Sequence, residues 1–254
     1  MAKSFSVTLQ NGASAIAARV RNTVDLRDAV SEMRLQRPRL ILVLIGGADA
    51  LAAPDIHRLS PFFEGTLAPL VQERRAFLVD GGTDVGVMRL MGQARARSGS
   101  DFPLIGVAAA GTVSLSVEET DSQDAAKLEP HHTHFFLVPG NNWGDESLWL
   151  SQVAEVLADG APAVTILVNG GDIAWEDVSV SVRASRPVIV ISGSGRVADE
   201  LTDAIAGRGS EKRALELVSS GLLRVVNLSE SSDTLAGVIE EIFPGKEPKW
   251  PGGA

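Results

Sequence analysis

Short apolar runs recur along the chain from residue 40 onward, and most are followed by a stretch of helical length. The runs cover residues 40–45, 76–79, 104–107, 135–138, 163–168, 188–191 and 223–228. Segments with helical spacing lie near residues 57–75, 85–98, 145–159, 173–184, 196–207 and 231–243. Because strands that alternate with helices form βαβ units, this pattern predicts an α/β fold with a doubly wound, mainly parallel sheet and helices on both faces.

The first forty residues have a different pattern, which predicts a hairpin and a helix. The expected elements are a strand at 5–9, a turn at Asn11-Gly12, a returning strand at 13–20 and a helix at 24–36. No linker divides the body, so we expect a single domain over residues 1–243, with 1–39 as an N-terminal extension. Residues 244–254 contain three prolines and three glycines, which predicts a flexible tail.

Composition narrows the class of protein. Hydrophobic residues make up 44% of the chain and charged residues 22%, which is ordinary for a globular protein. The absence of cysteine excludes disulfides, thiolate catalysis and cysteine-ligated metals. A net charge of −9 disfavours nucleic acid as a partner. The N-terminus lacks the apolar segment of a signal peptide, and no apolar run is long enough to cross a bilayer, so we expect a cytoplasmic protein without a membrane partner.

Nearly every predicted strand ends in glycine. The glycine positions are Gly46-Gly47, Gly81-Gly82, Gly140, Gly170-Gly171 and Gly193-Ser194-Gly195. In a doubly wound sheet these loops share the carboxyl edge, where ligands bind. One such pair is explained by a tight strand-to-helix turn, but a series at equivalent positions favours a shared ligand site.

The string DGGTDVGVM at residues 80–88 follows a predicted strand and opens a helix. The first backbone N–H groups of a helix have no partner inside it, and the helix dipole favours an anion there. Gly81, Gly82, Thr83, Gly86 and Val87 are therefore candidate ligand-binding residues, with the Thr83 hydroxyl as an extra donor. Gly86, like the later Gly92, would also let this helix pack closely against the sheet.

A second glycine motif, GSGRVAD, lies at residues 193–199. Ser194 is a candidate helix cap. Arg196 falls in the first helical turn, where the dipole disfavours a cation, and this predicts that it reaches a bound phosphate. The alternative for Arg196 is a salt bridge to Asp199 or Glu200.

The third motif, PGNNWGDES at residues 139–147, follows another predicted strand. Asn141 and Asn142 offer amide groups to a ribose or a base, and Trp143 either stacks on a base or covers the sheet edge. Asp145 and Glu146 are explained by the preference for carboxylates at a helix start. The sharper hypothesis makes Glu146 a general base.

Three of the four histidines gather in the string HHTH at residues 131–134. On a strand, His132 and His134 would share a face and His131 would point away. Because no nearby spacing completes a zinc set, a structural role is favoured over a metal site. No motif requires a cofactor. Mg²⁺ can accompany a phosphate through Asp49, Asp84 or Asp145, although any acidic surface offers as much.

Four strings in this order resemble the SLOG superfamily, and among its branches the LSDAT group, which includes the cytoplasmic N-terminal region of melastatin-type TRP channels. They are ILVLIGGA, FLVDGGTDVGVMRLMG, HTHFFLV and PVIVISGSGRVADEL, spread over residues 40–206. The resemblance implies a Rossmann-like fold and a stand-alone bacterial form of the domain. It also implies binding of a nucleotide-derived ligand, of which ADP-ribose is the best-known example. The binding residues that the resemblance implies are Gly46, Gly47, Gly81, Gly82, Thr83, Gly86, Val87, Gly193, Ser194, Gly195 and Arg196.

A sister branch of that superfamily contains the LOG-type phosphoribohydrolases, which carry PGGxGTxxE. Pro139, Gly140 and Gly144 fit that pattern, but Asn141 and Asp145 replace its second glycine and its threonine, and Glu146 comes too early. The sequence therefore favours a binding or sensor domain for an ADP-ribose- or NAD-related molecule. A nucleotide hydrolase that uses Glu146, with Asp84 as a partner, stays open as the alternative. A helix face over residues 148–157 can form a homo-oligomer, although periodicity does not separate such a face from the core.

Overall fold

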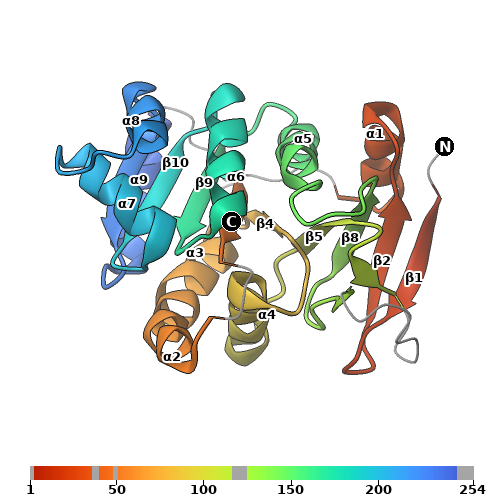
Figure 1. Ribbon diagram of the computed structural model, residues 1–254. Helices are drawn as coiled ribbons and strands as arrows, with labels where there is room; N and C mark the ends of the chain where they lie inside the picture. The colour runs from red at the N-terminus through yellow and green to blue at the C-terminus, as the bar shows by residue number, and fades with distance from the viewer. Residues whose placement is uncertain (1–2, 36–39, 48–50, 116–124, 245–254) are drawn as a thin grey trace, which may run out of the picture.

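The computed structural model describes residues 3–35, 40–47, 51–115 and 125–244. Within these residues a nine-stranded sheet forms the centre (Figure 1), in the order β1-β2-β8-β5-β4-β3-β9-β10-β11. All neighbouring strands run parallel except the hairpin of β1 and β2. The strands are β1 (Ser4–Thr8), β2 (Ser14–Arg19), β3 (Ile41–Gly46), β4 (Phe77–Asp80), β5 (Leu104–Ala109), β8 (His134–Val138), β9 (Ala163–Val168), β10 (Val188–Ser192) and β11 (Leu223–Asn227).

Helices cover both faces of the sheet because successive strand residues point to opposite sides. In β3, Ile41, Val43 and Ile45 enter one apolar core, whereas Leu42 and Leu44 enter the other. The first core lies under α1 (Thr23–Glu32), α5 (Ser147–Ala158), α6 (Asp172–Arg183), α7 (Arg196–Ile205) and α8 (Lys212–Ser219). The second lies under α2 (Ala53–Phe62), α3 (Ala68–Glu73), α4 (Gly86–Ser98) and α9 (Ser232–Ile242).

The winding reverses at the boundary between β3 and β9. From β3 the chain proceeds to β4 and β5 on one side, and from β9 it proceeds to β10 and β11 on the other. Gly46 allows this contact, because a Cβ atom there would lie 2.1 Å from the carbonyl oxygen of Val168. A reversal of this kind opens a crevice at the carboxyl edge of a parallel sheet, where ligands bind.

The fold class and the strands expected from the apolar runs are confirmed. The sequence pattern missed α8, and it missed a short two-stranded pairing of β6 (Val113–Ser114) with β7 (Ala126–Lys127). The helix expected at 57–75 is divided into α2, a π-helical turn at Phe63–Leu67 and α3, with Pro61 inside α2. Pro61 lacks the N–H group that a regular helix needs there.

Within the helix face over residues 148–157, Leu150, Val153 and Leu157 belong to the core under α5, whereas Leu148 is 57% exposed. No helix among the described residues is both long and apolar enough to cross a membrane. Asp49 and the expected tail from residue 245 onward lie outside the described residues.

Candidate functional site

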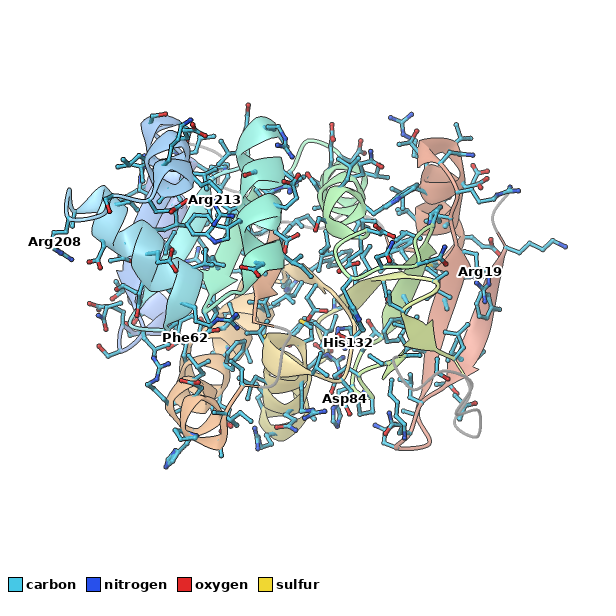
Figure 2. All side chains as sticks on the ribbon, viewed as in Figure 1. Arg19, Phe62, Asp84, His132, Arg208 and Arg213 are labelled. Atoms are coloured by element: carbon cyan, nitrogen blue, oxygen red, sulfur yellow. The ribbon has the colours of Figure 1, made fainter. Side chains whose placement is uncertain are left out.

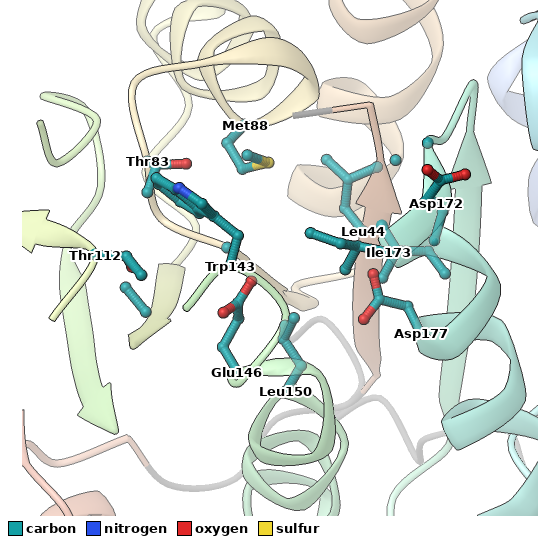
Figure 3. Close-up of a pocket in the computed structure, with 16 residues that line it drawn as sticks. Leu44, Thr83, Met88, Thr112, Trp143, Glu146, Leu150, Asp172, Ile173 and Asp177 are labelled. Atoms are coloured by element: carbon teal, nitrogen blue, oxygen red, sulfur yellow. The ribbon is translucent and has the colours of Figure 1, made fainter. Parts of the chain in front are cut away.

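A cleft of about 290 Å³ opens at the carboxyl edge of the sheet, between the first turns of α5 and α6 (Figure 3). It is lined by the last residues of β3 and by residues that follow β4, β5, β8 and β9, so it lies beside the winding reversal. Its lining residues are Leu44, Ile45, Gly46, Gly81, Thr83, Met88, Ala108, Thr112, Trp143, Glu146, Leu150, Gly171, Asp172, Ile173, Ala174 and Asp177. A volume near the lower end of the usual range for ligand pockets suits one ring and a sugar better than a whole dinucleotide.

Trp143 forms an exposed aromatic wall of this cleft. It is 44% exposed although its indole ring is large and apolar, and Figure 3 shows the ring at the mouth, next to Thr83. Ile173 on the opposite rim is 36% exposed. A large apolar side chain that stays exposed at a concave site offers a stacking surface to a flat ligand.

Two carboxyl groups lie on opposite walls of the cleft, and Figure 3 shows both directed into it. Glu146 accepts hydrogen bonds from the backbone N–H of Gly144 at 3.1 and 3.2 Å, and its burial raises the pKa of its carboxyl group. Burial, with a further contribution from the charge of Glu146, raises the pKa of Asp177 to about 7. The Oδ1 atom of Asp177 is buried and has no hydrogen-bond partner among the described residues.

The loop after β10 does not present the free amide groups that its glycines suggested. The N–H groups of Gly193 and Gly195 donate to the two carboxylate oxygens of Asp199, at 2.6 and 3.1 Å. Ser194 does not cap α7, because its hydroxyl is buried between the carbonyl of Ile191 and the N–H of Asn169. An internal carboxylate therefore already occupies the anion position of this loop.

Because Asp199 binds the loop amides, the guanidinium group of Arg196 has no partner there. Its expected alternative partners, Asp199 and Glu200, form no salt bridge with it, and Arg196 has no hydrogen bond or ion pair within the described residues. A Cβ atom at Gly171 would lie 3.0 Å from Nη2 of Arg196, so the guanidinium group lies over the start of α6. No side chain caps that helix start. A free guanidinium over an uncapped helix start is a suitable site for an anion.

A buried chain of ionisable groups supports the cleft loop after β4. His132 contacts Oδ1 of Asp80 through Nε2 and Oε2 of Glu129 through Nδ1, both at 2.8 Å. His131 contacts the other oxygen of Glu129 at 2.7 Å, and Oδ1 of Asp80 accepts from the N–H of Gly82. Burial alone would lower the pKa of His132, but the two carboxylates outweigh it and raise that pKa to about 9. These contacts tie the loop after β4 to the segment that precedes β8, and Figure 2 shows His132 in the interior.

These contacts support the structural role expected for the histidines but correct its geometry. β8 begins only at His134, so His131 and His132 lie in the preceding turn and not on a strand. Within the part of the chain that the structure describes, no group of three or more acidic or histidine side chains is arranged to hold a metal ion. Gly92 leaves room for the buried carboxylate of Glu129, because a Cβ atom at Gly92 would lie 2.1 Å from the carboxyl carbon of Glu129. Its expected role, close packing of the helix on the sheet, is thus replaced by room for a buried carboxylate.

The structure brings some of the expected site residues together at the cleft. Those that line it are Gly46, Gly81, Thr83, Trp143, Gly171 and Glu146. The others do not line it: Gly47, Gly82, Gly86, Val87, Gly140, Asn141, Asn142, Gly170, Gly193, Ser194, Gly195 and Arg196. Val87 is a core residue of α4, and Gly82 is required by packing, since a Cβ atom there would lie 2.7 Å from Cα of Gly106.

The acidic residues of the other motifs also have internal roles. Oδ2 of Asp145 accepts the N–H groups of Asn141 and Asn142 at 2.9 and 3.0 Å, which holds the loop before α5. These hydrogen bonds lower the pKa of Asp145. Asp84 pairs with Arg89 at 2.8 Å and does not line the cleft, so it is not placed to assist Glu146.

Sequence reasoning missed Asp172, Ile173, Asp177 and Thr112 as cleft residues. For Asp177 a weak signal existed: it is an acidic residue five positions after the start of a helix whose inward positions are mostly apolar. Its importance depends on the approach of α5, which periodicity does not reveal.

Comparisons with known proteins point to one family. A family model described as "SLOG in TRPM, prokaryote" matches residues 39–236. The chain is 26% identical over 249 residues to a transient receptor potential cation channel subfamily M member-like 2 of Nematostella vectensis, which covers 84% of this chain and 16% of that protein. It is 24% identical over 207 residues to subfamily M member 2 of Rattus norvegicus and 26% identical over 204 residues to that of Mus musculus, covering 68% and 65% of this chain. The chain spans 16% or less of the length of these relatives.

Proposed function

Because this chain belongs to the prokaryotic family of SLOG domains related to those of TRPM proteins, we propose that its cleft binds a nucleotide-derived small molecule of the ADP-ribose or NAD type. The observation that carries the proposal is the position and lining of the cleft. It lies at the carboxyl edge beside the winding reversal, with three glycines in its lining and an exposed tryptophan on its wall. The role we assign is recognition of a ligand, as in a sensor domain.

The phosphate groups of such a ligand bind at the start of α6, next to Arg196. The backbone N–H groups of Asp172 and Ile173 have no acceptor among the described residues, and the guanidinium of Arg196 lies over Gly171. This position differs from the one that the glycine motifs suggested, because Asp199 occupies the amide groups of the loop after β10. The ring and ribose then extend past Trp143 into the cleft.

Titration calorimetry with ADP-ribose, NAD⁺, ADP and AMP tests the proposal, with a thermal shift on the same samples. A ligand that binds only the native state raises the unfolding temperature at saturating concentration. Arg196→Ala should weaken binding about tenfold or more, the usual effect of losing a charge-assisted hydrogen bond. Arg208→Ala is the matched control, because Arg208 lies on the surface past the end of α7 and pairs with Asp203 (Figure 2). If none of the four compounds binds, the proposal is wrong.

A second candidate, hydrolysis of a nucleotide, is favoured by the two carboxyl groups that face each other across the cleft. Glycosidic and phosphoester hydrolysis both use a carboxylate to activate water, and a neighbouring carboxyl of raised pKa as a proton donor. In this candidate, Glu146 is the carboxylate that activates water and Asp177 is the proton donor. Chromatography of the calorimetry samples after long incubation distinguishes the candidates: intact ligand supports recognition, and consumed ligand supports hydrolysis.

A further inference from the structure

The cleft is acidic, and this restricts which end of a ligand it accepts. Glu146, Asp172 and Asp177 line it, whereas no lysine, arginine or histidine stands among the lining residues that the structure describes. The guanidinium of Arg196 lies over Gly171 but does not line the cleft, and the chain as a whole carries a net charge of −9. A phosphate group placed inside would face like charges at close range.

Asp177 is a carboxyl group of the cleft with an unsatisfied oxygen atom. Its Oδ1 atom is buried without a hydrogen-bond partner in the described part of the chain, although a buried carboxylate normally accepts several hydrogen bonds. Glu146 faces it across the cleft (Figure 3). Glu176 directly precedes it in α6, is exposed and pairs with Arg183 at 2.5 Å. Two facing carboxylates in a confined space need a shared proton or a positive charge between them.

Trp143 adds a flat surface beside this negative pair. Its ring is exposed at the mouth of the cleft and no described side chain stacks on it. A cation over the face of a tryptophan is attracted by the ring quadrupole, and the attraction grows when the site is shielded from water. The combination of a tryptophan face and a carboxyl pair is selective for a flat organic cation.

We propose that the cleft binds the positively charged pyridinium ring of an oxidised nicotinamide nucleotide and discriminates against the reduced ring, which is neutral. The inference rests on the proposed function and assigns the two ends of its ligand: the pyridinium and its ribose lie between Trp143 and the carboxyl pair, and the diphosphate lies at Arg196. Asp177 is the residue that determines this specificity.

Proton linkage gives the proposal a distinctive signature. Burial and the facing Glu146 raise the pKa of Asp177 to about 7, so this carboxyl group is protonated in a large fraction of free molecules near neutral pH. The pyridinium competes with that proton. If only the ionised form of Asp177 accepts the cation, the affinity rises about tenfold between pH 6 and pH 8, and binding near neutral pH releases a proton.

Calorimetry of NAD⁺, NADH and ADP-ribose at pH 6 and pH 8 tests the inference in the unaltered protein. We expect NAD⁺ to bind at least tenfold more tightly than NADH at pH 8. Only NAD⁺ should show the pH dependence, and its binding heat at pH 7 should change with the ionisation enthalpy of the buffer. Equal affinities for NAD⁺ and NADH would overturn the inference and leave the proposed function intact, because both compounds carry the ADP-ribose end. Failure of all three compounds to bind would remove the proposed function and the inference together.

The variant Asp177→Asn tests whether the charge of Asp177, and not the shape of its side chain, determines the preference for NAD⁺ over NADH. It keeps the shape of the side chain and removes the charge, so NAD⁺ and NADH should bind within about twofold of each other and the pH dependence should disappear. Asp203→Asn makes the same change on the exposed side of α7 and should retain the wild-type preference. A preference for NAD⁺ that survives in Asp177→Asn would contradict the role assigned to this residue. The comparison of NAD⁺ with NADH in the wild type decides the main inference if the variant does not fold.

Discussion

Replacing His132 with alanine removes the centre of the buried chain that links Asp80, Glu129 and His131. The imidazole is fully enclosed and contacts one carboxylate through each of its nitrogen atoms. Without it, two buried carboxylates lose their main counter-charge while they remain in the interior. Removing one partner from such a buried ionic network lowers the unfolding free energy by about 3–5 kcal/mol. For a chain of this size, that loss lowers the unfolding temperature by about 6–20 °C.

The pH dependence provides a second, independent measure of the same interaction. The pKa of His132 is raised from 6.5 to about 9 in the folded protein. A raised pKa means that the stabilising contribution is complete below about pH 6.5 and is lost as the pH rises through about 9. The shift corresponds to about 3 kcal/mol. Unfolding free energy should therefore decline between pH 7 and pH 10 in the wild type, and this decline should be much smaller in His132→Ala.

Urea denaturation followed by circular dichroism at pH 6.5, 8 and 9.5 measures both effects. His57→Ala is the control, since His57 is an exposed residue of α2 with no part in the chain. A loss below about 1 kcal/mol at pH 6.5, which is the size of an ordinary single substitution, would refute the description of His132 as a charged buried link. An unchanged pH slope in the variant would refute it as well.

Two further substitutions test how glycines and an internal carboxylate hold the loops of the carboxyl edge. Gly82→Ala should destabilise the protein by about 2 kcal/mol or more in a thermal melt, because φ is +68° and the new Cβ would lie 2.7 Å from Cα of Gly106. Gly65→Ala is the control and should be close to neutral in the same melt, because nothing lies within 4 Å of a Cβ atom there. Asp199→Ala removes the acceptor of two loop amides and should lower the unfolding free energy by about 0.5–2 kcal/mol, like the loss of a helix cap. The control Asp203→Ala should lower it by less than about 0.5 kcal/mol, and equal losses in urea titrations would contradict the loop geometry.

Much of the fold was predictable because it depends on local patterns. The fully apolar runs, with residues such as Ile41 and Leu42 buried on opposite faces, identify strands of a sheet covered on both sides. The hairpin at Asn11-Gly12 follows from turn chemistry and is confirmed by the pairing of β1 with β2. The short helix α8 was missed because its apolar positions span only two turns, which is too short for periodicity to stand out.

The candidate site was predictable only as a region. Glycine at the ends of parallel strands correctly indicated the edge of the sheet where the cleft lies, and Trp143 and Glu146 fall on its wall. Which loop amides are free was not readable, since Asp199 competes for the same donors that a phosphate would use. A glycine motif indicates that the backbone can adopt a tight turn, but it does not indicate whether a carboxylate one helical turn later binds the amide groups of that turn.

By itself, the sequence determined most of the strands and helices along the chain, the doubly wound class and the edge of the sheet at which the cleft lies. Only the tertiary structure decided which side chains meet there. It set Asp177 of α6 against Glu146 at the start of α5, and it joined Asp80 to His132 across 52 positions of the chain. Periodicity and turn chemistry act over a few residues, whereas the charge and the proton affinity of a site depend on groups that only folding brings within a few ångströms.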